Sequence, residues 1–203
     1  MEKPAAPDHP IHELLSRRWS PRVFSNRAVP AETLRSLFEA ARWAPSSSNE
    51  QPWHFLLATQ ENPTEFSRLL SCLKDGNVRW VKQAPVLMIS VTRLTWEEDH
   101  TPNRHAFHDI GLAVANLTVQ AMAMGLFVHQ MAGFMPEKVK ELYALPDEYE
   151  AVTAITLGYP GDPTSLPDDL KKRELAPRER KPIESFVFHG RWGQVAPLAR
   201  RPS

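Results

Sequence analysis

One long apolar stretch constrains the fold of this chain more than any other feature of its sequence. Between residues 110 and 128, only Asn116, Thr118 and Gln120 are clearly polar. A stretch of about this length could cross a membrane, but Gly125 interrupts it and the sequence has no second stretch of the kind. The pattern therefore favours a central core helix, followed by a strand over residues 126–131. Asn116 and Gln120 are four residues apart, so both fall on one helix face and could bond across a packed interface.

The composition indicates a soluble globular protein of one domain. The chain has 203 residues, of which 42% are hydrophobic and 24% charged. Its 24 Lys and Arg balance 24 Asp and Glu, which argues against a nucleic-acid partner. Because Cys72 is the single cysteine, we expect no disulfide framework and no multi-cysteine metal site. Residues 1–10 lack the apolar core of a signal peptide, so we expect a cytoplasmic protein without a membrane anchor.

Helix and strand signals mix along the chain without a regular β-α-β repeat, which favours the α+β class. Apolar spacing predicts helices over residues 11–18, 30–44, 63–73 and 136–143. Cys72 falls in the third of these and is expected to be an inert core thiol. Strands are predicted over residues 53–59, 85–92, 151–157 and 185–189. Residues 161–182 are predicted to form a proline-rich, charged loop, and so long a connection is typically functional or an exchanged arm.

Two basic segments are candidate anion sites. Arg18, Ser20 and Arg22 lie within five residues at a predicted helix end, and guanidinium groups match phosphate oxygens well. The alternative is a solvated helix end whose arginines balance the helix dipole. Residues 171–181 carry six Lys or Arg and two Glu, a net charge of +4. They form either a solvated loop or a second anion-binding patch, since no aromatic residues alternate with them to stack on bases.

A polar loop and a histidine cluster are the other candidates. Residues 45–53 hold hydroxyl and amide side chains between prolines, so they form either a stiff ligand-binding loop or a simple helix-to-strand turn. His100, His105, His108 and Asp109 could include metal ligands. Their spacing matches no metal motif, and a polar helix N-terminus explains them, so no metal site is expected.

An ordered series of segments runs through most of the chain. It comprises RRWSPRVF at 17–24, EAARWAPSSSNEQPWHF at 39–55, Asn77, DIGLAVANLTVQAMAMGL at 109–126, AGF at 132–134, ITLGYP at 155–160 and RERKP at 178–182. Together, in this order, these segments resemble the nitroreductase family of FMN-dependent oxidoreductases. The resemblance covers residues 11–193.

The resemblance implies an α-β-α sandwich around a mostly antiparallel central sheet. It also implies an intertwined homodimer with FMN at each subunit interface. The family domain would span residues 11–193, of which 161–193 form an extended C-terminal arm exchanged between subunits. Residues 1–10 would be a flexible N-terminal segment, and residues 194–203 a tail.

Site residues follow from the resemblance position by position. Arg18 would bind the FMN phosphate, and Arg22 would lie near the N1–O2 edge of the flavin. The backbone of Ala132 and Gly133 would approach flavin N5, which makes these two and Arg22 the catalytic candidates. The expected cofactor-binding set is Arg18, Trp19, Ser20, Arg22, Pro45, Ser46, Ser47, Ser48, Asn49, Gln51, Asn77, Ala132, Gly133, Arg178 and Arg180. Residues 45–51 of this set would reach the flavin of the partner subunit. Many family members have an acidic residue where Ala132 stands and a basic one where Trp80 stands.

The resemblance also implies an activity. We expect an FMN-dependent oxidoreductase that takes hydride from NAD(P)H and reduces nitroaromatic, quinone or similar small planar acceptors by a ping-pong mechanism. The alternatives are a non-catalytic flavin-binding or storage dimer, a structural or adaptor dimer that binds no flavin, and a family relative with oxidase, dehalogenase or flavin-consuming chemistry.

Overall fold

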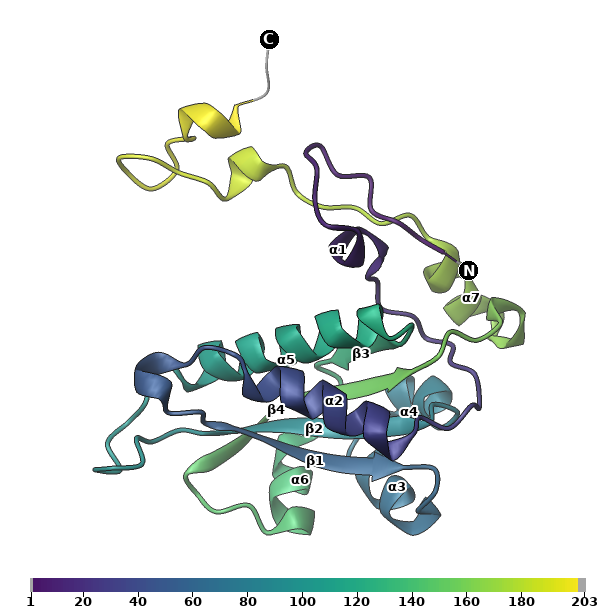
Figure 1. Cartoon of the computed structure of the whole chain (residues 1–203). Helices are drawn as coiled ribbons and strands as arrows, with labels where there is room; N and C mark the ends of the chain where they lie inside the picture. Colours follow the sequence, from purple (N-terminus) through teal and green to yellow (C-terminus); the bar gives the residue numbers. More distant parts are fainter. Residues whose placement is uncertain (1, 201–203) are drawn as a thin grey trace.

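A computed structural model describes residues 2–200 as a sheet covered by helices on both faces (Figure 1). The strands are β1 (Trp53–Thr59), β2 (Val86–Arg93), β3 (Phe127–Met131) and β4 (Tyr149–Gly158). They form one antiparallel sheet in the order β1-β2-β4-β3. The predicted α+β class and the mostly antiparallel sheet are confirmed.

The helices form the two outer layers. One face carries α2 (Ala31–Arg42) and α5 (Ala106–Ala123), and the other carries α3 (Pro63–Leu70), α4 (Asp75–Val81) and α6 (Pro136–Tyr143). Two short helices, α1 (Glu13–Arg17) and α7 (Asp168–Leu175), lie outside these layers. Within the described residues there are also four 3-10 turns: η1 (Ser47–Asn49), η2 (Pro163–Ser165), η3 (Ile183–Ser185) and η4 (Pro197–Ala199).

The apolar stretch forms α5 and β3, as its pattern predicts. Gly125 adopts a φ of 75° just past the end of α5, a conformation that glycine accepts without strain. The Asn116 side chain donates to the carbonyl of Ala40 at 3.2 Å, and that of Gln120 donates to Ser36 Oγ at 3.1 Å. Both bonds cross from α5 to α2. No helix within residues 2–200 is long and apolar enough to span a membrane.

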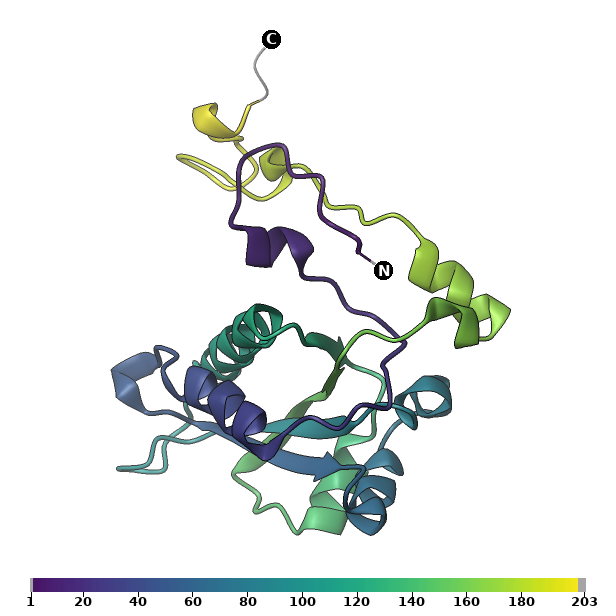
Figure 2. The ribbon, with the colours of Figure 1, turned by 45° about the vertical axis from the view of Figure 1, so that its right-hand side comes forward.

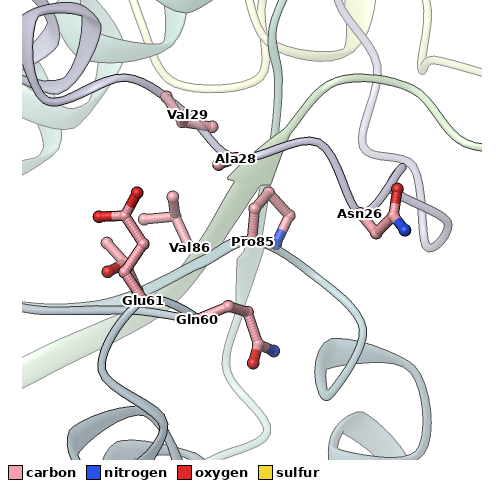
Figure 3. Close-up of a pocket in the computed structure, with 8 residues that line it drawn as sticks. Asn26, Ala28, Val29, Gln60, Glu61, Pro85 and Val86 are labelled. Atoms are coloured by element: carbon pink, nitrogen blue, oxygen red, sulfur yellow. The ribbon is translucent and has the colours of Figure 1, made fainter.

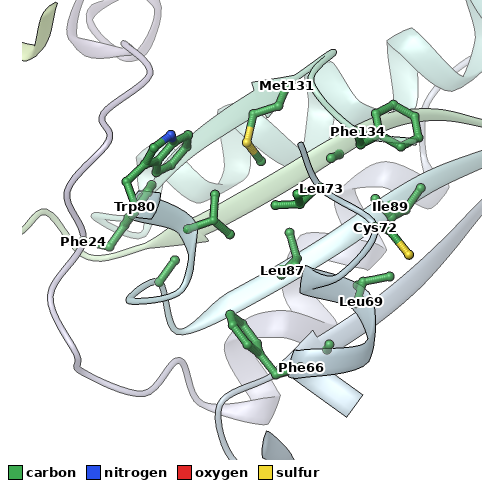
Figure 4. Packing of buried hydrophobic residues seen from close by; sticks show 14 of the residues in the cluster. Phe24, Phe66, Leu69, Cys72, Leu73, Trp80, Leu87, Ile89, Met131 and Phe134 are labelled. Carbon is green, nitrogen blue, oxygen red and sulfur yellow. The ribbon is translucent and has the colours of Figure 1, made fainter. Parts of the chain in front are cut away.

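The sheet separates two apolar cores. The first lies between the sheet and α2 with α5. The second lies under α3, α4 and α6, and Figure 4 shows Trp80, Met131 and Phe134 among its side chains. Cys72 belongs to this second core, two residues past the end of α3 rather than inside a helix. Burial raises the pKa of its thiol.

Two predictions for the C-terminal part are wrong. Residues 161–182 are not an unstructured loop, because they contain η2 and α7. Pro167 precedes α7, and acidic residues in its first turn and basic residues in its last suit the helix dipole. Residues 185–189 form no strand; Phe188 makes an isolated bridge to Val195. The chain there extends away from the sheet and has no neighbouring strand to join (Figure 2).

The two ends of the chain run beside each other before the C-terminal part continues outward (Figures 1 and 2). The amide of Ala5 donates to the carbonyl of Ser16 at 2.8 Å, so the N-terminal segment also contacts the end of α1. The predicted tail, residues 194–203, lies partly outside the described residues. Within it, η4 buries Ala199.

Candidate functional site

The two basic segments meet in one pocket. It has a volume of about 250 Å³ and is lined by the segment after α1, by the end of α7 and by the chain that follows α7. Trp19 and Ser20 belong to its lining, and Nη1 of Arg18 donates a hydrogen bond to Ser20 Oγ at 3.4 Å. We call it the cationic pocket after six of its lining residues: Lys3, Arg18, Arg22, Arg173, Arg178 and Arg180.

Like charges dominate this pocket. Glu179 is the carboxylate among its lining residues. Burial, together with the charges of Arg178 and Arg180, lowers the pKa of Arg18. Burial and the charge of Arg180 likewise lower the pKa of Arg178. Guanidinium groups that disfavour one another's charge are stabilised by an anion placed among them, so the pocket suits an anionic ligand.

Glu174 fixes the backbone at Arg22. The amide of Arg22 donates to both carboxylate oxygens of Glu174 at 3.0 Å, and Arg22 Nη1 lies 4.0 Å from Glu174 Oε2. Glu174 is fully buried. It lies in α7, 152 residues after Arg22 in the sequence. Burial raises the pKa of its carboxyl. A buried carboxylate is tolerated when such hydrogen bonds and an ion pair satisfy it.

His129 supports the same segment from the sheet. Its Nδ1 lies 2.7 Å from the carbonyl of Pro21. A carbonyl oxygen only accepts hydrogen bonds, so Nδ1 is the protonated nitrogen. The ring also contacts Trp80, with centroids 4.7 Å apart. Burial lowers the pKa of His129 to about 4, and the charge of Arg22 adds to this effect. A neutral imidazole therefore holds the residue before Arg22.

Asn77 and Gly133 contact each other directly. Asn77 Nδ2 donates to the Gly133 carbonyl at 3.0 Å, and the amide of Lys74 donates to the same oxygen at 3.0 Å. A Cβ at position 133 would lie 2.4 Å from Asn77 Nδ2, so any larger residue there would displace the Asn77 side chain. Ala132 is exposed, and Gly133 is half-buried. These contacts bring the start of α4 to the end of β3.

The polar loop after α2 does not join the cationic pocket of its own chain. In Figure 1 this loop lies at the left of the molecule, at the C-terminal end of α2, whereas α7 lies at the right. Ser48, Asn49 and Gln51 have φ between 49° and 58°, so the loop is tightly turned. The amide of Gln51 donates to Ser46 Oγ at 3.0 Å, and the amide of Ser47 donates to Asp109 Oδ2 at 3.1 Å.

Asp109, one of the four residues considered as metal ligands, has a structural role instead. This buried carboxylate lies in the first turn of α5 and binds the amide of Ser47. Across residues 2–200, no group of three or more His, Cys, Asp or Glu side chains is placed to hold a metal ion.

A second pocket, separate from the cationic pocket, is shown in Figure 3. It has a volume of about 190 Å³ and is lined by Glu61 and by apolar and uncharged polar side chains. That composition is unsuited to an anion.

Sequence reasoning missed Lys3 in the lining of the cationic pocket and the role of Glu174 behind it. Lys3 belongs to a proline-containing segment with no motif, and Glu174 lies in the part expected to be a loop. Arg173 falls within residues 171–181, the predicted second basic segment. A charged run after Pro167 was the available signal for α7. Nothing in the local pattern around Glu174 indicates that it packs against a segment 152 residues away.

Comparisons with known proteins identify the family of this chain. The sequence model described as "Nitroreductase family" matches residues 15–73 and 61–159. The chain belongs to the nitroreductase family. This confirms the resemblance, and with it the α-β-α sandwich fold.

Relatives of this nitroreductase family member include both named and unnamed proteins. A protein of Stenotrophomonas maltophilia, provisionally named an NADH dehydrogenase/NAD(P)H nitroreductase, is 30% identical over 162 residues, covering 71% of this chain and 81% of the relative. An uncharacterized 15.4 kDa protein of Mycolicibacterium smegmatis, from the ask 5' region, is 33% identical over 128 residues, covering 63% and 84%. A crystal structure described as an oxidoreductase containing FMN matches with a TM-score of 0.86 and 33% identity, covering 92% of this chain and 94% of that one.

Proposed function

We propose that this nitroreductase family member is an FMN-dependent oxidoreductase that takes hydride from NAD(P)H and reduces nitroaromatic, quinone or similar small planar acceptors. One observation carries the proposal: Arg18, Arg22, Arg178 and Arg180, from opposite ends of the chain, line a single pocket. The similar structure described as containing FMN supports the choice of cofactor. The name of the Stenotrophomonas relative supports NAD(P)H as the electron donor.

The residues of the cationic pocket fit the phosphate end of FMN. A phosphate monoester is a dianion near neutral pH, and several guanidinium groups with one hydroxyl match its oxygens. Within residues 2–200, the buried Nε1 of Trp19 has no hydrogen-bond partner, so the lining also holds a donor that a bound anion or hydroxyl could satisfy. Arg18, Ser20, Arg178 and Arg180 would hold the phosphate.

Arg22, Asn77, Ala132 and Gly133 would hold the flavin ring system. Bound FMN supplies the redox chemistry, since it can accept hydride from NAD(P)H and pass electrons to an acceptor. The backbone of Arg22 is fixed by Glu174, so its guanidinium group extends from a defined position. A positive charge held in place stabilises negative charge that develops nearby, here on the reduced flavin. Asn77 would contact the pyrimidine side of the flavin. The backbone of Ala132 and Gly133 would face N5.

A homodimer would complete the site. The polar loop, residues 45–51, lies away from the cationic pocket of its own chain, so we propose that it contributes to the site of a partner subunit. The extended C-terminal part supports this assembly. Phe186, Trp192 and Leu198 are 62%, 91% and 83% exposed along it, and apolar side chains gathered on an outstretched arm favour burial against another chain.

The chemical step is tested by replacing Arg22 with alanine. Loss of one charge-assisted interaction, about 1.5–3 kcal/mol, should slow flavin reduction by NAD(P)H roughly ten- to a hundredfold. Stopped-flow absorbance measures this rate, and Arg35→Ala, which removes a surface arginine paired with Glu32, is the control. An unchanged reduction rate in Arg22→Ala would remove Arg22 from the mechanism.

The steady-state pattern tests the overall scheme. NAD(P)H and the acceptor would bind in turn at the same place beside the flavin ring, so double-reciprocal plots should be parallel. Intersecting plots would contradict the ping-pong scheme. Bound FMN without turnover would instead indicate a storage or flavin-binding role.

A further inference from the structure

The N-terminal segment takes part in the cationic pocket through Lys3. Its Nζ donates to the carbonyl of Glu174 and to that of Ala176, both at 2.6 Å. It also lies 4.8 Å from the ring centroid of Trp19. The ammonium group thus joins the last turn of α7, the chain after it and a buried aromatic ring of the pocket lining.

The backbone of the same segment holds Arg178. One guanidinium nitrogen of Arg178, Nη1, donates to the carbonyl of Lys3 at 2.6 Å and to that of Ser16 at 2.8 Å. The amide of Ala5 donates to the carbonyl of Ser16 at 2.8 Å. Residues 3–5 therefore bridge the end of α1 and the arm at the point where Arg178 enters the pocket.

These contacts offset an unfavourable arrangement of charge. Burial lowers the pKa of Lys3, and the nearby charges of Arg178 and Arg22 add to this effect, while the charge of Glu174 opposes it. Arginine side chains that repel one another need fixed acceptors to stay in place. The carbonyls of Lys3 and Ser16 are such acceptors for Arg178. Without them, its long side chain would be free to leave the pocket.

We propose that residues 3–5 act as a clasp that positions the Arg178 guanidinium for the phosphate of the cofactor, with Lys3 as the anchor of the clasp. This inference rests on the proposed function for the identity of the ligand. The clasp itself rests only on the contacts above. Lys3 is a positioning residue in this account, because its hydrogen bonds go to protein carbonyls and it acts on the phosphate through Arg178.

The test compares FMN with riboflavin, which has the same ring system and lacks the phosphate. Lys3→Ala should weaken FMN binding about tenfold or more, the loss expected for a displaced charge-assisted contact, and leave riboflavin binding unchanged. Lys3→Arg keeps the charge and the donors, so it should recover most of the affinity. Lys172→Ala removes an equal charge from an exposed position of α7 and should have little effect on either ligand. Fluorescence titration of the flavin-free full chain measures both affinities for the wild type and the three variants.

The double variant separates positioning from direct charge. If Lys3 acts through Arg178, Lys3→Ala combined with Arg178→Ala should bind FMN no more weakly than Arg178→Ala alone. Losses that multiply would show that Lys3 acts on the phosphate by its own charge, and would overturn the positioning role. Equal weakening of FMN and riboflavin, or no weakening by Lys3→Ala, would also overturn it.

A second measurement is independent of flavin. Hydrogen exchange of the flavin-free protein should show protection at the amide of Ala5, and Lys3→Ala should abolish this protection. Unchanged exchange would overturn the clasp. If wild-type protein binds no FMN while Lys3→Ala still exposes Ala5, the proposed function fails and the clasp stands as a contact that orders the arm.

Discussion

Two buried polar side chains, Glu174 and His129, hold the single peptide group that joins Pro21 to Arg22. The carboxylate of Glu174 accepts the Arg22 amide, and the imidazole of His129 donates to the Pro21 carbonyl. Buried polar groups contribute in this way only when their partners are in place, since an unpaired one costs about 1–3 kcal/mol. Each therefore helps to fix the backbone from which the Arg22 side chain extends.

His129 should make stability fall as the pH is lowered. Its pKa is about 4 in the folded protein against 6.5 ordinarily, so between these values the unfolded chain binds a proton that the folded chain does not. Linkage then favours the unfolded state as the pH falls, by about 2 kcal/mol between pH 7 and pH 5. Urea unfolding of the flavin-free protein at both pH values measures this loss.

His129→Asn provides the comparison, because its amide can donate near the position of Nδ1 and does not titrate. The variant should lose about 2 kcal/mol less than wild type over the same pH interval. Equal losses in the two proteins would mean that His129 is not a buried neutral histidine.

At the scale of elements, hydrogen bonds connect the helices and loops on one face of the sheet. Asn116 and Gln120 join α5 to α2, and Asp109, in the first turn of α5, joins it to the polar loop. The loop is thereby tied to a helix that packs in the core. This gives the loop a rigid support, although three of its residues have positive φ.

Asp109→Ala should loosen this loop and lower the free energy of unfolding. The substitution leaves the Ser47 amide without its partner, at a cost of about 1–3 kcal/mol. Asp109→Asn keeps an acceptor oxygen and should lose less. Urea unfolding of both variants checks the ranking, and a loss in Asp109→Asn as large as that in Asp109→Ala would show that the charge, rather than the bond to Ser47, matters.

The elements that sequence reasoning predicted are those with regular apolar patterns. The strands β1, β2 and β4 are apolar runs, and α2 and α5 repeat apolar residues at helical spacing. By contrast, α7 buries only Leu170 and Glu174, which leaves no apolar stripe to detect. The short helix α4, which carries Asn77, has seven residues and includes Gly76, so its helical signal is weak.

The site was accessible to sequence reasoning only in part. Charge and spacing marked Arg18 and Arg22, and separately Arg178 and Arg180, as candidate anion ligands. Their meeting in one pocket depends on the path of the chain over some 150 intervening residues, which no local pattern contains. The roles of Glu174 and Lys3 depend on the same long-range contacts.

At the scale of the whole molecule, the described chain combines a compact sandwich with an arm that leaves it (Figures 1 and 2). Phe188 and Trp192 contact each other within the arm, with ring centroids 5.1 Å apart. The arm therefore has local order of its own while presenting apolar surface. Such a shape is consistent with two chains that wrap around each other.

Ending the chain after Lys181 should weaken a homodimer. The shortened chain keeps every cationic residue of the pocket but lacks Phe186, Trp192 and Leu198, and burial of each such side chain contributes about 1.5–3 kcal/mol. We expect the dimer dissociation constant to rise at least about tenfold. Light scattering over a range of concentrations measures it. A full-length chain that stays monomeric at every concentration would contradict the proposed dimer.

This chain should bind FMN, and an absorbance spectrum of the purified protein shows directly whether it does. We expect the two visible bands of an oxidised flavin, with FMN released into the supernatant when the sample is denatured by heat. Protein that purifies without flavin should acquire the bands when FMN is added and the excess removed. A protein that stays colourless after that addition would not be an FMN-binding protein, and the proposed function would be wrong.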